Sequence, residues 1–129
     1  MTAAGPFEVK VIPQPPGEDA VIGRLTLDKT FHGDLEATSK GQMLAFSSSI
    51  KGSAGYVAME QVTGTLRGRQ GTFVLQHRGI MTRGDGQLAV TVVPDSGTED
   101  LVGLSGAMTI DITGGKHSYV FDYTIDGAA

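Results

Sequence analysis

Two residues of this sequence are candidates for acid–base catalysis, and Glu60 is the first. Its strand parity is that of Tyr56, Ala58 and Val62 in the segment 56–62. If that face lines the interior, desolvation raises the pKa of Glu60 and suits its carboxyl group to acid–base catalysis. The alternative, with the odd-numbered residues of the segment inward, leaves Glu60 solvated.

His77 is the second candidate, because it shares parity with Phe73 and Leu75. An imidazole on such a face is either a general base or a hydrogen-bonded core residue, and the sequence leaves both open. His32 and His117 fall near predicted turns and are expected at the surface. No two histidines have the spacing of two or four that a metal site uses. The sequence therefore predicts neither a metal site nor a cofactor.

Lys29 also lies on the apolar parity of its segment, between Leu27 and Phe31. A buried lysine needs a partner. Pairing with Glu60 is one alternative. Snorkelling of the ammonium group to solvent at a barrel rim is the expected arrangement.

Alternation of apolar and polar residues dominates the chain and predicts strands. The predicted strands cover 7–11, 25–31, 35–50, 56–66, 72–82, 88–92, 108–112 and 119–125, with one short helical turn at 98–102. Glycine-containing turns separate them, including a turn at 83–86, whose Asp-Gly pair is a strong hairpin signal. Sequential hairpins favour a meander that closes on itself. The predicted fold is all-β, an eight-stranded antiparallel closed barrel with little or no helix.

Composition limits the classes of function. A chain of 129 residues is expected to form one domain, with a core at 5–126 and flexible termini at 1–4 and 127–129. The absence of cysteine excludes disulfides and thiolate nucleophiles and is compatible with a cytoplasmic location. No signal peptide or membrane-spanning segment is expected. A net charge of −4 argues against nucleic-acid binding.

Three segments together resemble a known family. They are KTFHGDLE at 29–36, GTLRGRQGTFVLQH at 64–77 and VPDSGTEDLVGLSG at 93–106. This pattern is similar to that of small, functionally uncharacterised bacterial proteins, a domain-of-unknown-function family grouped with the allene oxide cyclase-like barrels.

A wider similarity links the chain to plant allene oxide cyclases and dirigent proteins. It rests on Gly97-Thr98 and the segment 103–106, while Glu99 and Leu101 depart from that pattern, where a glycine and a phenylalanine are expected. The resemblance implies a barrel with an apolar lumen and is compatible with a homo-oligomer. It does not carry over cyclase activity, because no residue here is matched to the lumen carboxylate of that enzyme.

Three hypotheses of function follow. The first is a barrel that binds a small apolar or carboxylate-bearing molecule in its lumen. The second is a cofactor-free isomerase or cyclase in which Glu60 or His77 moves a proton. The third is a structural module with a filled lumen whose outer face forms a homo-oligomer. The expected ligand-binding residues are Lys29, Phe46, Tyr56, Phe73, Tyr119 and Phe121.

Overall fold

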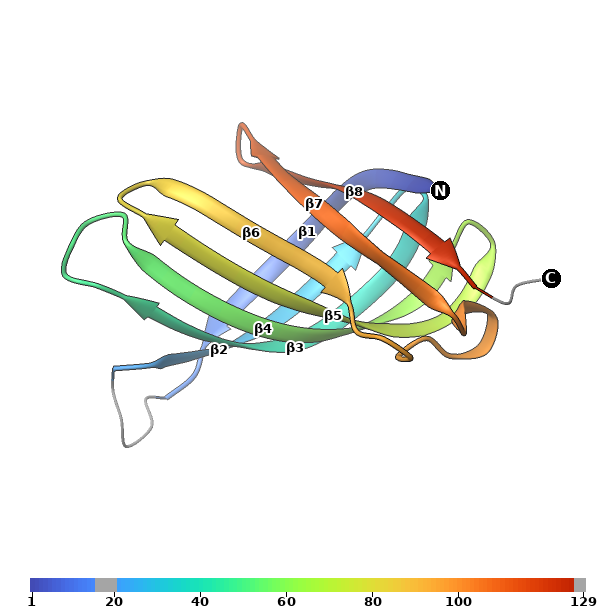
Figure 1. Ribbon diagram of the computed structural model, residues 1–129, viewed down its shortest axis with the longest axis horizontal. Helices are drawn as coiled ribbons and strands as arrows, with labels where there is room; N and C mark the ends of the chain where they lie inside the picture. The colour runs from blue at the N-terminus through green and yellow to red at the C-terminus, as the bar shows by residue number, and fades with distance from the viewer. Residues whose placement is uncertain (16–20, 127–129) are drawn as a thin grey trace.

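In the computed structural model, which describes residues 1–15 and 21–126, eight antiparallel strands form a closed barrel. Each strand pairs with its neighbours in sequence, and β8 pairs with β1 (Figure 1). The elements are β1 (Thr2–Pro13), β2 (Gly23–Phe31), β3 (Leu35–Ser47), β4 (Ala54–Leu66), β5 (Arg69–Thr82), β6 (Asp85–Val92), the 3₁₀ helix η1 (Glu99–Leu101), β7 (Leu104–Thr113) and β8 (Lys116–Ile125).

The predicted closed barrel is confirmed, and so is the short helical turn near residue 100. Most of the strands begin before their predicted first residue, most clearly β1 and β7, and β3 is shorter than predicted. Residues 2–4, expected in a flexible terminus, begin β1, where Ala3 has 0% exposure because it lies opposite Phe121 of β8. The third strand ends at Ser47, because residues 48–53 form a hydrogen-bonded turn. Residues 127–129 lie outside the described part of the chain.

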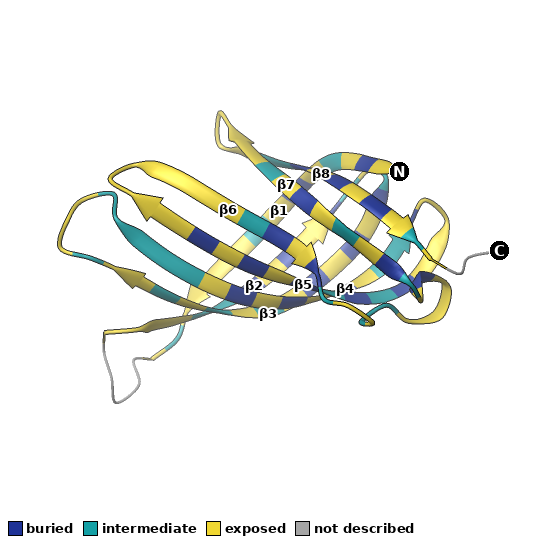
Figure 2. Ribbon diagram, in the orientation of Figure 1, coloured by how far each residue is buried: buried dark blue, intermediate teal, exposed yellow. Residues whose placement is uncertain are grey.

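One half of the barrel interior is filled by side chains, and this half contains the β2–β3 and β4–β5 turns. We call it the closed end. Large inward residues pack there in one continuous core, and Leu101 of η1 packs into that core from the β6–β7 connection. Figure 2 shows buried residues concentrated toward this end of the strands, whereas the opposite hairpins are exposed. The core residues are Ala3, Phe7, Phe31, Leu35, Ala37, Val62, Leu66, Phe73, Leu75, Val90, Val92, Leu101, Leu104, Met108, Tyr119, Phe121 and Tyr123.

The other end of the barrel, which we call the mouth, is bounded by the β3–β4, β5–β6 and β7–β8 turns. Over the described strands, β6 and β7 share only two register pairs, Val90 with Met108 and Thr91 with Ala107. Toward the mouth the two strands diverge (Figure 1). Residues 85–89 and 109–113 therefore leave a seam of unpaired strand edges on one side of the mouth.

Within the described residues, the structure contains no helix long and apolar enough to cross a membrane.

Candidate functional site

Four polar side chains meet inside the barrel, just below the mouth, and we call them the buried cluster: Lys29, Ser39, Glu60 and His77. All four are at most 7% exposed. The Nζ atom of Lys29 lies 2.9 Å from Oε1 of Glu60, and the Ser39 hydroxyl donates to Oε2. His77 Nε2 makes a very short hydrogen bond to Oε1 of Glu60. His77 lies on the inward face as predicted, and of the two arrangements that the sequence left open for Glu60 the structure has the inward one.

The sequence of β3 makes room for this cluster. Gly41 lies opposite Glu60 on β4 and opposite Leu27 on β2. A Cβ atom at residue 41 would lie 2.7 Å from the Cβ of Glu60 and 2.4 Å from the carbonyl oxygen of Met59. Any larger residue at this position would collide with the strand that carries the carboxylate.

Glu60 is ionised, which differs from the sequence expectation of a raised pKa. Burial alone would raise the pKa of Glu60, but the hydrogen bond from His77, the positive charge of Lys29 and the hydrogen bond from Ser39 oppose it. Together they lower this pKa from 4.5 to about 2. Because an ionised carboxylate only accepts hydrogen bonds, Nε2 of His77 carries the proton between them. Glu60 is therefore a weak base that can orient His77 rather than a poised proton carrier.

The prediction that Lys29 snorkels to solvent is wrong. Its side chain is 6% exposed and paired with Glu60. The ammonium group also lies 5.4 Å from the ring centre of Phe7 and 5.9 Å from that of Phe31, which is within cation–π range. An ion pair and two aromatic faces replace the water that the ammonium group loses.

A cavity of about 590 Å³ occupies the mouth. Its size is typical of small-molecule sites. No charged side chain lines it among the residues that the structure describes. We call it the mouth cavity; its inward-facing lining includes Met43, Ala45, Tyr56, Gly79, Met81, Leu88 and Ile112.

Tyr56 is the aromatic residue that connects the mouth cavity to the buried cluster. It lines the cavity, and its ring centre lies 6.5 Å from that of His77. Burial raises the pKa of the Tyr56 phenol, and the negative charge of Glu60 raises it further. The hydroxyl group is therefore neutral and can donate a hydrogen bond. The sequence predicts Tyr56 as a ligand-binding residue, and its place in the cavity wall agrees with that expectation.

Of the other predicted ligand-binding residues, Phe73 and Phe121 lie in the filled core. Their rings are stacked with centres 5.9 Å apart, and both residues are at most 1% exposed. Phe46 has outward parity on β3 and is 43% exposed, and it lies at the rim of the mouth cavity. The structure therefore separates residues that the sequence grouped together.

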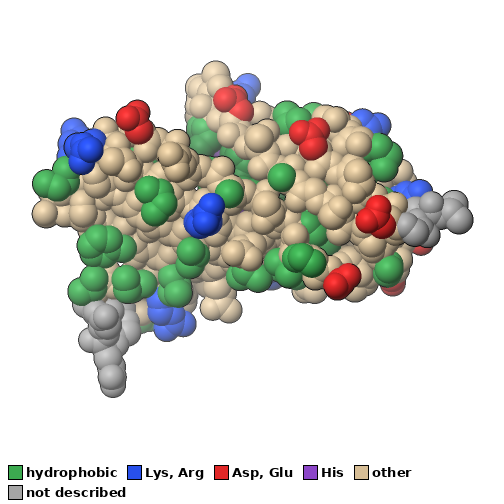
Figure 3. Space-filling view, in the orientation of Figure 1, with side chains coloured by type: hydrophobic (Ala, Val, Ile, Leu, Met, Phe, Trp, Pro, Cys, Tyr) green, Lys and Arg blue, Asp and Glu red, His purple; other side chains and the backbone are tan. Residues whose placement is uncertain are grey.

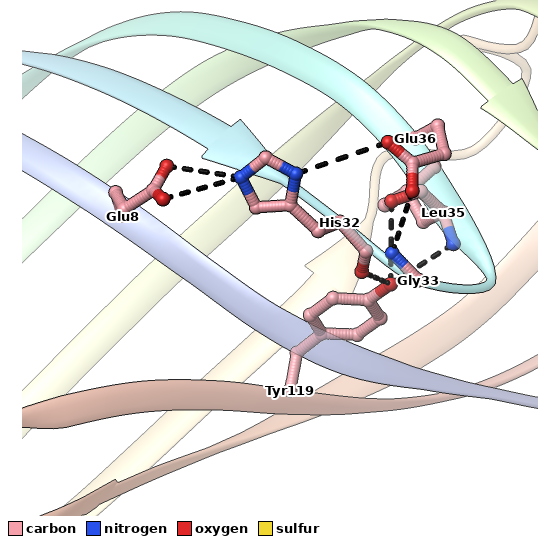
Figure 4. Close-up of polar contacts among 6 residues, drawn as sticks. All are labelled: Glu8, His32, Gly33, Leu35, Glu36 and Tyr119. Carbon is pink, nitrogen blue, oxygen red and sulfur yellow. Dashed lines mark hydrogen bonds and ion pairs between the residues drawn. The ribbon is translucent and has the colours of Figure 1, made fainter.

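Tyr119 has a structural partner at the closed end (Figure 4). Its hydroxyl donates to the carbonyl oxygen of His32 at 2.7 Å and accepts from the amide of Leu35 at 2.9 Å. The His32 ring lies between Glu8 and Glu36, with nitrogen–oxygen distances of 3.0 and 3.9 Å. These contacts fix the β2–β3 turn, and Tyr119 is not among the residues that line the mouth cavity.

Sequence reasoning missed Ser39 and most of the residues that line the mouth cavity. The hairpin register contains a usable signal, because the β2–β3 turn places Ser39 directly opposite Lys29. Along β3 the odd-numbered residues face inward, so Met43 and Ala45 face the interior while Phe46 faces outward. Strand parity carried across each turn could have identified these residues.

A larger hollow of about 960 Å³ lies on the outside of the barrel, across β2 to β5. We call it the outer groove. Outward-facing Leu44, Val57 and Met59 line it together with Arg24, Lys40 and four glutamines. Hydrophobic side chains also gather over the mouth-side ends of β2, β3 and β4 (Figure 3). The mouth cavity is the better candidate site, because it is lined by uncharged side chains and lies next to the buried cluster.

Within the part of the chain that the structure describes, no group of three or more His, Asp or Glu side chains is arranged to hold a metal ion.

Comparison with known proteins adds a family and a solved fold. The family model described as "Protein of unknown function (DUF3224)" matches residues 3–123. A crystal structure of a protein of unknown function from this family, from Shewanella oneidensis MR-1, is 51% identical. The match covers 98% of both chains with a TM-score of 0.90. No curated protein matches the chain.

Proposed function

This chain belongs to the DUF3224 family, whose function is unknown, and we propose that it binds one small, largely apolar molecule in the mouth cavity of its barrel. The observation that carries the proposal is a cavity of about 590 Å³ lined by uncharged and mostly apolar side chains. Burial of apolar ligand surface against such walls is favourable at about 25 cal/mol per Å².

The exposure of the cavity walls supports this proposal. Met81, Leu88 and Ile112 face the interior of the barrel but are 45%, 47% and 63% exposed. At the closed end, residues with the same inward parity are almost fully buried. An apolar ligand in the mouth would cover the side chains that the protein leaves uncovered.

Two alternatives from the sequence have less support. Neither Glu60 nor His77 lines the mouth cavity, and both are at most 3% exposed, so the isomerase or cyclase hypothesis lacks a path from substrate to base. The filled-barrel hypothesis describes the closed end well but leaves the open mouth without a role. A homo-oligomer stays a prediction, and native mass spectrometry of the purified protein measures it together with any retained ligand.

A pair of matched leucines provides the test. Leu88 lies in the mouth cavity and is 47% exposed, whereas Leu44 lies in the outer groove and is 48% exposed. The probe is Nile red, an uncharged apolar dye whose fluorescence rises on transfer from water. We expect Leu88→Asp to weaken binding by at least about 10-fold, because the carboxylate is unpaired in an apolar site. Leu44→Asp leaves binding unchanged.

Two results would contradict the proposal. One is wild-type protein that shows no saturable binding of the dye. The other is a loss caused by Leu44→Asp that equals or exceeds the loss caused by Leu88→Asp, which would place the dye in the outer groove. Circular dichroism of both variants controls for folding.

A further inference from the structure

We propose, on the basis of the proposed binding function, that Tyr56 selects the ligand class: its hydroxyl donates a hydrogen bond to a neutral oxygen of the ligand. The ligand is then an uncharged, largely apolar carbonyl compound. This excludes a simple hydrocarbon as the preferred ligand, and it excludes an acid bound with its carboxylate inside the cavity.

The ring of Tyr56 is held in place by a glycine on the neighbouring strand. Tyr56 of β4 pairs with Gly79 of β5. A Cβ atom at residue 79 would lie 2.3 Å from Cε1 and 2.7 Å from Cδ1 of the Tyr56 ring. The ring therefore lies across the bare backbone of Gly79, and this contact sets the position of the hydroxyl group.

The hydroxyl of Tyr56 has no hydrogen-bond partner among the described residues. This is a contrast with Tyr119, whose hydroxyl is fully used by the β2–β3 turn. It is also a contrast with the buried cluster, in which every oxygen of Glu60 already accepts a hydrogen bond. Tyr56 is therefore the cavity-lining aromatic donor that is still available to a ligand.

The charge of the cavity determines what kind of acceptor fits. No lysine, arginine or histidine lines the mouth cavity within the described residues. A ligand carboxylate would lose its water without gaining a counter-ion, which is costly. A ketone or aldehyde costs much less free energy to desolvate, and one hydrogen bond inside the cavity compensates for that cost. The neighbouring Lys29 cannot serve as counter-ion, because it is already paired with Glu60.

The experiment compares two probes of the same shape, 2-acetylnaphthalene and 2-ethylnaphthalene, on wild-type protein and on Tyr56→Phe. The measured quantity is the ratio of their dissociation constants. We expect Tyr56→Phe to reduce the preference for the ketone by about 5-fold, the size of one neutral hydrogen bond. Binding of 2-ethylnaphthalene stays unchanged. The carbonyl stretching frequency of the bound ketone is lowered in the wild type and not in the variant.

A second variant tests the position of the ring. Gly79→Ala forces the Tyr56 ring to move, so it reduces the ketone preference even though the hydroxyl is still present. Naphthalene-2-carboxylate, the charged probe, binds more weakly than the ketone to the wild type.

The outcomes separate this inference from the proposed function. If Tyr56→Phe leaves the ratio of the two dissociation constants unchanged, whether or not both affinities fall, the role of Tyr56 is overturned while the binding cavity stands. Absence of binding of both probes to the wild type overturns the proposed function and this inference with it.

Discussion

Leu75 of β5 and Leu88 of β6 both face the interior of the barrel, but Leu75 is 0% exposed and Leu88 is 47% exposed. The difference lies in the residues around them. Leu75 belongs to the core of the closed end, where phenylalanine rings fill the interior. Around Leu88 the inward positions hold small residues such as Ala45 and Gly79, and β6 separates from β7.

This contrast shows how one barrel can combine a densely packed half with an open mouth. Side-chain volume at inward positions decides whether a small barrel is solid or hollow, since the backbone framework is shared. The buried cluster lies between the two halves, where it closes the bottom of the mouth with polar groups that satisfy one another.

The largest expected effect comes from removing the ion pair of Lys29 and Glu60 in the buried cluster. Glu60→Leu leaves the Lys29 ammonium buried without its carboxylate, and we expect a loss of about 3–5 kcal/mol in the free energy of unfolding. The double variant Lys29→Met with Glu60→Leu recovers much of that loss, because the unpaired charge is gone. Urea denaturation measures the free energy of unfolding of both variants. A Glu60→Leu variant as stable as the wild type would contradict a stabilising role of the ion pair.

The two leucines themselves sharpen the comparison. Leu75→Ala removes a fully packed side chain and is expected to cost about 2–5 kcal/mol. Leu88→Ala is expected to cost less than about 1 kcal/mol, because its side chain already faces the open mouth. Chemical denaturation of both variants is the measurement. Equal costs would mean that the mouth is packed in solution.

The pH dependence of stability isolates Glu60. Its pKa is lowered from 4.5 to about 2 in the folded protein, so its stabilising effect is present above pH 4.5 and is lost as the pH falls toward 2. The shift corresponds to about 3 kcal/mol. We expect the stability difference between wild type and Glu60→Gln to shrink over this range. A difference that is independent of pH there would contradict an ionised, hydrogen-bonded Glu60.

The smallest effect concerns the seam between β6 and β7. Amide hydrogens of residues 85–89 and 109–113 that face the seam lack a strand partner, so we expect them to exchange with solvent much faster than amides between β3 and β4. Hydrogen exchange followed by NMR provides the comparison. Equally slow exchange at both places would indicate a seam that is closed in solution.

The sequence predicted the barrel because alternation and glycine turns are local signals. It also predicted the inward position of His77, whereas it left the inward and the solvated arrangement of Glu60 open. It did not predict the ionised state of Glu60, since the pKa of Glu60 depends on His77, Lys29 and Ser39 from three other strands. It placed Phe46 with Phe73, although one is outward at the rim and the other is in the core, because parity was not carried through β3.

The most direct test of binding in the mouth uses the five methionines of the chain. Met81 lines the mouth cavity alone, Met59 lines the outer groove alone, and Met43 lies in the lining of both. Met108 is buried in the core and Met1 is at the N-terminus. Protein labelled with ¹³C in its methionine methyl groups is titrated with 2-acetylnaphthalene. The account predicts shifts of the Met43 and Met81 signals while Met59 and Met1 stay in place. A shift of Met59 without a shift of Met81, or no shift at all, would contradict it.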